Sequence, residues 1–84
     1  MLKCENNSNS FAIMKEELLI KFGKRIKSLR KERNWSQEKL AEETNFHRTY
    51  IGMIERGERN PSLTSINVFA ETFNLKLFEL FKLD

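Results

Sequence analysis

The sequence predicts a compact all-α domain of five helices. Apolar residues recur at intervals of three and four along most of the chain, as on one face of a helix. No useful length alternates apolar and polar residues as a half-buried strand does, and the single proline, Pro61, falls in a polar loop. The 84 residues suit one small domain, which we place at residues 14–84. Residues 1–13 are polar and predict an arm or an extension of the first helix.

The first helix is predicted from Ser10 to Arg33. Apolar residues spaced by 4, 4 and 3 form one stripe, which we expect to face the core: Leu18, Phe22, Ile26 and Leu29. The remaining faces are rich in Lys and Arg, as expected of a surface in contact with water. Gly23 lies mid-helix at a cost of about 1 kcal/mol relative to alanine, which is tolerable where packing is close.

Two short helices follow. Ser36 is a good N-cap for a helix over Gln37 to Thr44, and Asn45 tolerates the left-handed conformation that ends a helix. A third helix is predicted to start near His47 or Arg48 and to stop at Gly57, with Ile51 and Ile54 facing the core.

The last two helices carry most of the aromatic residues. Ser62 is expected to cap a fourth helix that ends at Asn74. Its apolar stripe is Leu63, Ile66, Phe69, Ala70 and Phe73. A short fifth helix is predicted from Leu77 to Lys82.

Composition excludes several functional classes. The 15 Lys and Arg exceed the 12 Asp and Glu by three, which is compatible with an anionic partner. One cysteine allows no internal disulfide, and no apolar run reaches the roughly 20 residues of a membrane span, so we expect a cytoplasmic protein without a membrane partner. The chain has no phosphate-binding glycine loop, no HExxH motif and a lone His47, so we expect no enzymatic activity, metal or cofactor.

The second and third helices have a helix-turn-helix arrangement. Few residues join them, and Ala41 is small enough to let them cross closely. The spacing of Gln37, Ala41, Asn45, Ile51 and Ile54, followed by IERGERNPS, resembles the lambda-repressor-like (Cro and repressor) helix-turn-helix family from about Phe22 to Phe81. Asn45 replaces the glycine usual in that family. The resemblance implies a sequence-specific DNA-binding transcriptional regulator.

The third helix is the expected recognition element. With Ile51 and Ile54 inward, its outer surface should carry Arg48, Thr49, Gly52 and Met53, flanked by Tyr50. The resemblance implies that its first turn enters the major groove, where the base-contact candidates are Arg48, Thr49, Tyr50 and Met53. The alternative is that Arg48 and Thr49 are ordinary solvated residues and that Tyr50 and Met53 are packing residues.

Further polar residues match positions that contact the DNA backbone in that family. The candidates are Ser36, Gln37, His47, Arg59, Asn60 and Ser65. Each also has an alternative role in helix capping or in the loop. By resemblance, Arg30 and Glu55 form a partly buried ion pair that is structural.

The family reads two half-sites as a two-fold dimer, and the C-terminal end has apolar residues to spare. We expect Phe69, Phe73, Leu75, Leu77 and Leu80 to point inward. The candidate interface is then Val68, Phe78, Phe81 and Leu83. Alternatively, these residues wrap a monomeric core.

Within the family, HRTYIGMIERGERNPSL and the small size are most similar to the controller proteins of restriction-modification systems. That similarity implies a pseudo-palindromic operator upstream of the controller's own gene, activation at low and repression at high occupancy, and a contact with the RNA polymerase sigma subunit. A prophage-type repressor or an antitoxin would have nearly the same third helix. A different class, a basic amphipathic module that binds a membrane or a partner's groove, would need Leu18, Phe22, Ile26 and Leu29 exposed, whereas the core is expected to require them.

Overall fold

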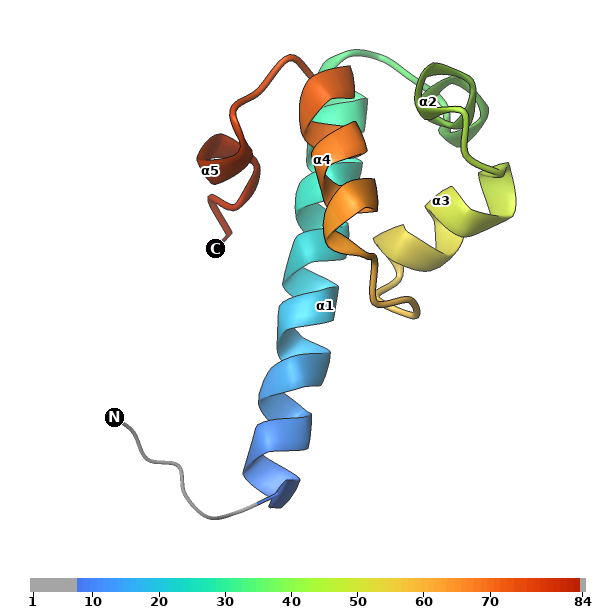
Figure 1. Cartoon of the computed structure of the whole chain (residues 1–84). Coiled ribbons are helices and arrows are strands. Elements are labelled where there is room, and N and C mark those ends of the chain that lie inside the picture. The colour runs from blue at the N-terminus through green and yellow to red at the C-terminus, as the bar shows by residue number, and fades with distance from the viewer. Residues whose placement is uncertain (1–7, 84) are drawn as a thin grey trace.

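The computed structural model describes residues 8–83, and its five helices surround one core (Figure 1). They are α1 (Ser8–Glu32), α2 (Gln37–Thr44), α3 (Arg48–Glu55), α4 (Leu63–Thr72) and α5 (Leu77–Leu80). In Figure 1, α2 and α3 lie on one side of α1 and α5 lies on the other. Residues 8–83 contain no strand, which confirms the all-α prediction. The predicted boundary between residues 13 and 14 falls inside α1, and the first part of the expected arm lies outside the described residues.

The helix ends follow the capping chemistry of the sequence. The Ser36 hydroxyl accepts a hydrogen bond from the Lys39 N–H at 3.0 Å, and Asn45 has the left-handed φ of 64°. Gly57 also has a positive φ, of 76°, just after α3. At the ends of the chain the boundaries differ slightly, because α1 starts at Ser8 rather than Ser10 and α5 ends at Leu80 rather than Lys82.

The core is built mainly from the predicted stripes. Phe69 lies at its centre, fully buried, with the Phe22 ring at 6.3 Å and the Phe46 ring at 5.4 Å in edge-to-face contact. Trp35 packs at the margin, where its ring stacks on Phe73 at 6.0 Å. The buried apolar residues are Phe22, Ile26, Leu29, Leu40, Ala41, Ile51, Ile54, Phe69, Ala70, Phe73 and Leu80.

Three leucines that the pattern assigns to the core are exposed instead. Leu18 is 53% exposed, because the N-terminal part of α1 extends past the other described helices (Figure 1). Leu63 and Leu77 are 71% and 38% exposed, since each is the first residue of its helix and precedes the turn that meets the core. Gly52 is the opposite case. The pattern places it on the outer surface of α3, but it is buried, because the Arg48 and Arg56 side chains lie beside it.

Helix α3 is held in place by a close crossing with α1 at Gly23. A Cβ at this position would overlap the carbonyl oxygen of Ile54 and would lie 2.7 Å from that of Glu55. The backbones therefore touch at a distance that only glycine permits. This contact sets the orientation of α3, and with it the orientation of the candidate recognition surface.

Arg25 of α1 and Arg33, which directly follows α1, bind the C-terminal ends of other helices, although the sequence pattern placed them on a solvated face. Arg25 donates hydrogen bonds to the carbonyl oxygens of Glu79, at 2.8 Å, and Leu80, at 3.3 Å. Arg33 donates to the carbonyl oxygen of Phe73 at 2.8 Å. A cation near the last carbonyls of a helix also interacts favourably with the helix dipole. These arginines therefore tie α4 and α5 to α1.

Candidate nucleic-acid interface

The outer face of α3 presents polar side chains because its inner face is occupied by the core. Ile51 and Ile54 are 0% and 1% exposed. Arg48 and Thr49 are exposed, and Met53 is half-buried. The predicted division of the helix is therefore confirmed for the isoleucines and for its first turn. Two exposed side chains, a guanidinium and a hydroxyl with a methyl group, stand at the N-terminal end of a short helix.

Arg48 has a carboxylate partner that the sequence pattern does not indicate. Its Nε lies 3.3 Å from Oε2 of Glu38, and both side chains are exposed. The pKa of Glu38 is lowered, first by a hydrogen bond from its own backbone N–H and then by the hydrogen bond from Arg48. An exposed pair of this kind is weak, so Arg48 can leave Glu38 for a stronger acceptor.

Most of the remaining candidates gather in a hollow between the starts of α3 and α4. The Arg59 guanidinium stacks over the Tyr50 ring at 5.3 Å, and that ring contacts Phe46 edge-to-face at 5.0 Å. The hollow is lined by Asn45, Phe46, His47, Tyr50, Arg59, Asn60, Ser62 and Ser65. Five candidates are thus neighbours, and they come from α3, from α4 and from the segments that precede these helices.

Several of the polar candidates also have structural roles. Ser36 caps α2, and the Ser65 N–H donates to the Ser62 hydroxyl, which in turn donates to the Ser65 hydroxyl, both at 3.1 Å. His47 precedes α3, but its side chain makes no capping hydrogen bond, so the first N–H groups of α3 have no side-chain partner there. An unsatisfied helix N-terminus is a suitable position for an anionic group such as a phosphate.

Arg30 and Glu55 form the ion pair that the family resemblance implies. Arg30 Nε and Nη2 donate to the two carboxylate oxygens of Glu55 at 2.7 and 3.1 Å, and Arg30 Nη1 donates to the Trp35 carbonyl at 2.7 Å. Both residues are buried. Gln37 donates to Glu55 as well, at 3.1 Å, which the sequence pattern does not indicate. The group therefore connects α1, α2 and α3.

Arg56 is a cation near the recognition surface that the motif does not single out. It lies two turns after Arg48, and its guanidinium pairs with Glu58 at 2.9 and 3.2 Å. This pairing raises the pKa of Arg56 and lowers that of Glu58. A spacing of eight residues puts Arg56 on the same side of α3 as Arg48. This spacing is the feature of the sequence from which Arg56 could have been predicted as part of the recognition surface.

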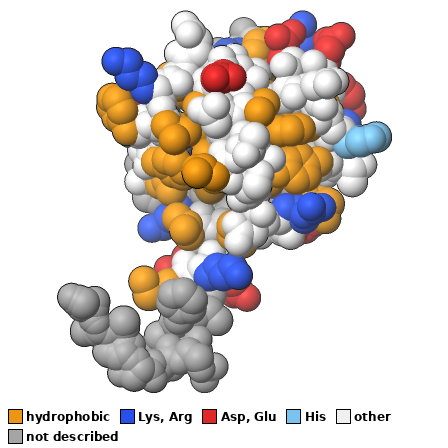
Figure 2. All heavy atoms as spheres, viewed as in Figure 1, with side chains coloured by type: hydrophobic (Ala, Val, Ile, Leu, Met, Phe, Trp, Pro, Cys, Tyr) orange, Lys and Arg blue, Asp and Glu red, His pale blue; other side chains and the backbone are white. Residues whose placement is uncertain are grey.

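The residues assigned to a dimer interface divide into two groups. Phe78 and Phe81 are 66% and 41% exposed, whereas Val68 and Leu83 are half-buried. The Phe81 ring also packs against Phe22 at 5.8 Å. Figure 2 shows hydrophobic side chains gathered on the visible face, including the part over α4 and α5.

Two kinds of feature are absent from the described residues. Within residues 8–83, no helix is both long enough and apolar enough to cross a membrane. The same part of the chain has no cluster of three or more His, Cys, Asp or Glu side chains that could hold a metal ion.

Residues 26–80 match the family model described as helix-turn-helix. This match spans more than half of the chain and includes α2, the turn and α3. The chain belongs to the helix-turn-helix family.

Relatives within the helix-turn-helix family include controller proteins. Control protein C.BamHI of Bacillus amyloliquefaciens is 41% identical over 64 residues, which cover 75% of this chain and 79% of the relative. The restriction-modification controller protein C.AhdI from Aeromonas hydrophila is 43% identical in sequence, and its crystal structure matches with a TM-score of 0.72. The match covers 75% of this chain and 96% of that one. The C.Esp1396I tetramer, in complex with its natural 35 base-pair operator, is 35% identical with a TM-score of 0.71 over 77% of this chain and 86% of that one.

Family membership confirms the predicted class of protein. The chain is a DNA-binding transcriptional regulator of the helix-turn-helix type and not an enzyme. The predicted likeness to restriction-modification controllers is also confirmed, since these proteins are among its relatives in both sequence and structure. The roles of the individual site residues remain predictions.

Proposed function

We propose that the chain is the controller of a restriction-modification system and binds a pseudo-palindromic DNA operator as a homodimer. The observation that supports this most directly is the orientation of α3, whose isoleucines are buried while Arg48 and Thr49 are exposed. The controller C.Esp1396I, a structural relative, has been solved on its operator. We therefore assign α3 to the major groove of each half-site.

In this assignment Arg48 contacts a base, and the residues of the α3–α4 hollow contact the DNA backbone. An arginine can donate two parallel hydrogen bonds to O6 and N7 of guanine, which distinguishes guanine from the other bases. To do so, Arg48 must release Glu38, and the exposure of that pair keeps the cost small. Thr49, Tyr50 and Met53 complete the base-contact surface as neighbours of Arg48 on α3.

We assign contacts with the DNA backbone to polar residues at the start of α2 and in the α3–α4 hollow. His47, Arg59, Asn60 and Ser65 line that hollow, and the free N–H groups at the start of α3 open beside it. Ser36 and Gln37 stand at the start of α2, where backbone N–H groups again favour a phosphate. Such contacts strengthen binding to every sequence, and they make it depend on salt concentration.

The proposal extends to the promoter. A small DNA-bound protein activates transcription through contact with polymerase, so we propose the RNA polymerase sigma subunit as a further partner and the cytoplasm as the place of action. For the dimer we propose the surface with Phe78, Phe81, Val68 and Leu83, because the two phenylalanines are large and exposed.

Selection of duplexes from a random pool tests the proposed function. The wild-type protein is incubated with the pool, bound duplexes are recovered and sequenced over several rounds, and the enriched sequence is footprinted. We expect two inverted half-sites whose centres lie about 10 base pairs apart, since a two-fold dimer places its two α3 helices one DNA turn apart. Recovery of no enriched sequence, or of a single half-site without a partner, would contradict the proposal.

A further inference from the structure

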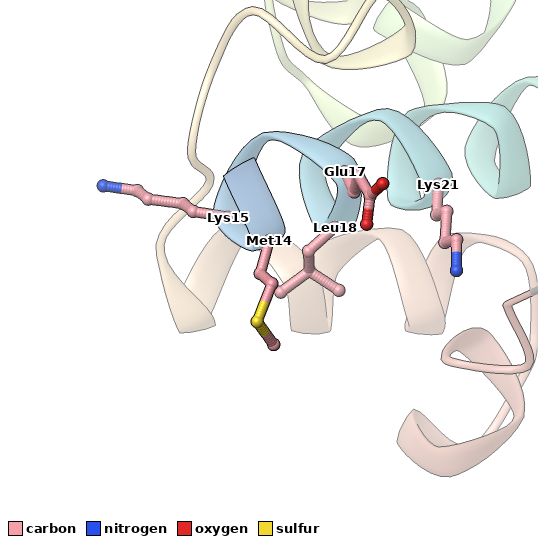
Figure 3. Close-up of a pocket in the computed structure, with 5 residues that line it drawn as sticks. All are labelled: Met14, Lys15, Glu17, Leu18 and Lys21. Carbon is pink, nitrogen blue, oxygen red and sulfur yellow. The ribbon is translucent and has the colours of Figure 1, made fainter. Parts of the chain in front are cut away.

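The N-terminal part of α1 exposes large apolar side chains. Met14 is 64% exposed and Leu18 is 53% exposed. Figure 3 shows that both point away from the same side of the helix, as expected for residues one turn apart. We call these two residues the α1 apolar stripe. Nothing in the described part of the chain covers it, so it leaves apolar surface in water that a partner could bury favourably.

The α1 apolar stripe continues towards α5. The next residue along this side of α1 is Phe22, whose ring lies 5.8 Å from that of Phe81. Arg25, further along the same side, binds the last carbonyl oxygens of α5. Phe81 of the proposed dimer surface therefore lies against α1 about one turn beyond Leu18, on the side of the helix to which the stripe belongs.

The dimer surface proposed above is small by itself. From their exposed fractions of 66% and 41%, Phe78 and Phe81 offer roughly 200 Å². A stable protein–protein interface buries about 800 Å² on each partner, of which somewhat more than half is apolar. Val68 and Leu83 are half-buried and add less than the phenylalanines do. Met14 and Leu18 would add an area of the same order as the phenylalanines, which brings the apolar total closer to that of a stable dimer.

The charges beside the α1 apolar stripe suit a second copy of this chain. Lys15, Glu17 and Lys21 lie around it (Figure 3). In a two-fold contact the same patch is present on both sides, so a patch that carries both signs can pair with itself. An anionic membrane surface would instead favour a rim of cations alone, and Glu17 would oppose it.

We propose that Met14 and Leu18 extend the homodimer interface and are covered by a second copy of this chain. This inference rests on the proposed dimeric function. The family match begins at residue 26, so the two residues lie before the matched region and extend the interface beyond it.

Sedimentation equilibrium over a range of protein concentrations tests the inference. The variants are Met14→Glu and Leu18→Glu on the stripe, Phe78→Glu on α5, and Leu63→Glu as a matched control. Leu63 is also an exposed apolar residue, at 71%, but it lies at the start of α4 beside Ser62 and the α3–α4 hollow. We expect each stripe variant and Phe78→Glu to raise the dimer Kd at least tenfold, and the control to leave it unchanged.

The fold of each variant is checked by circular dichroism and thermal melting at a concentration where all are monomeric. If Leu18→Glu and Met14→Glu dimerise like the wild type while Phe78→Glu does not, the inference is overturned and the α5 interface stands. If Leu18→Glu lowers the melting temperature of the monomer without changing the dimer Kd, the chain's own residues cover the stripe and the inference is again overturned. A wild type that stays monomeric even on a duplex with two half-sites overturns the proposed dimer itself.

Discussion

Replacing Gly23 with alanine tests how closely α1 and α3 cross. In an open helix this substitution stabilises by about 1 kcal/mol, because alanine is the better helix former. Here the added Cβ would overlap the carbonyl oxygen of Ile54, and it would lie 2.7 and 2.9 Å from the carbonyl oxygen and carbon of Glu55. These are backbone atoms, which cannot rotate away as the end of a side chain can.

The distances indicate the size of the effect. Carbon–oxygen contacts normally lie at about 3.3–3.6 Å, so α1 and α3 must separate by roughly 1 Å. Overpacking of a well-filled core costs about 1–3 kcal/mol, and strain on two backbone carbonyls should place Gly23→Ala at the upper end. After the gain in helix propensity we expect a net loss of about 2 kcal/mol. For a domain of this size, such a loss lowers the melting temperature by about 10 °C.

Thermal and urea unfolding followed by circular dichroism measure this change, and Gly52→Ala is the matched control. Gly52 is also in the interior of a helix, but its Cβ would meet only the ends of the Arg56 and Arg48 side chains, at 3.1 and 3.8 Å. We expect the control to be as stable as the wild type or more stable by up to about 1 kcal/mol. A Gly23→Ala protein that matches or exceeds wild-type stability would refute the close crossing.

Three further predictions concern the ion pairs. Glu55→Ala should destabilise the fold by about 3–5 kcal/mol in urea unfolding, because Arg30 is left buried with an uncompensated charge; a loss below 1 kcal/mol would contradict this. Glu38→Gln should tighten operator binding about threefold in a fluorescence anisotropy titration, since it frees Arg48, whereas Glu42→Gln should tighten it less; equal effects would argue against the Arg48 pairing. Carbon-13 NMR titration should show that Arg48→Ala raises the pKa of Glu38 only part of the way to its ordinary value, because the larger cause is the backbone hydrogen bond; full recovery, or no change, would be inconsistent with that order of causes.

The helices could be predicted from the sequence because their signals are local. Ser36 and Asn45 mark the ends of α2 through hydrogen bonds and backbone angles that depend on a few neighbouring residues. Leu18 shows the limit of such signals. Its spacing predicts which side of α1 it occupies, but burial also requires a second element that packs against that side. The described helices leave that part of α1 uncovered.

The candidate site was predictable in outline for the same reason. Once Ile51 and Ile54 are inward, the helical period places Arg48 and Thr49 outward. The partners of these and other polar residues were not predictable, because Glu38 reaches Arg48 only after α2 and α3 have packed. Arg25 and Arg33 likewise bind carbonyl groups more than 30 residues away in sequence, which their position on a basic helix does not reveal.

The most direct test of DNA readout by α3 is the operator preference of Arg48→Ala. Anisotropy titrations give the affinity for the selected operator and for a random duplex of equal length, at one salt concentration, for the wild type, Arg48→Ala and the surface control Lys27→Ala. We expect the ratio of the two affinities to fall at least tenfold for Arg48→Ala alone, because one bidentate arginine–guanine contact discriminates by about 1–3 kcal/mol. An equal loss of affinity for operator and random duplex would contradict the assignment of α3 to base recognition.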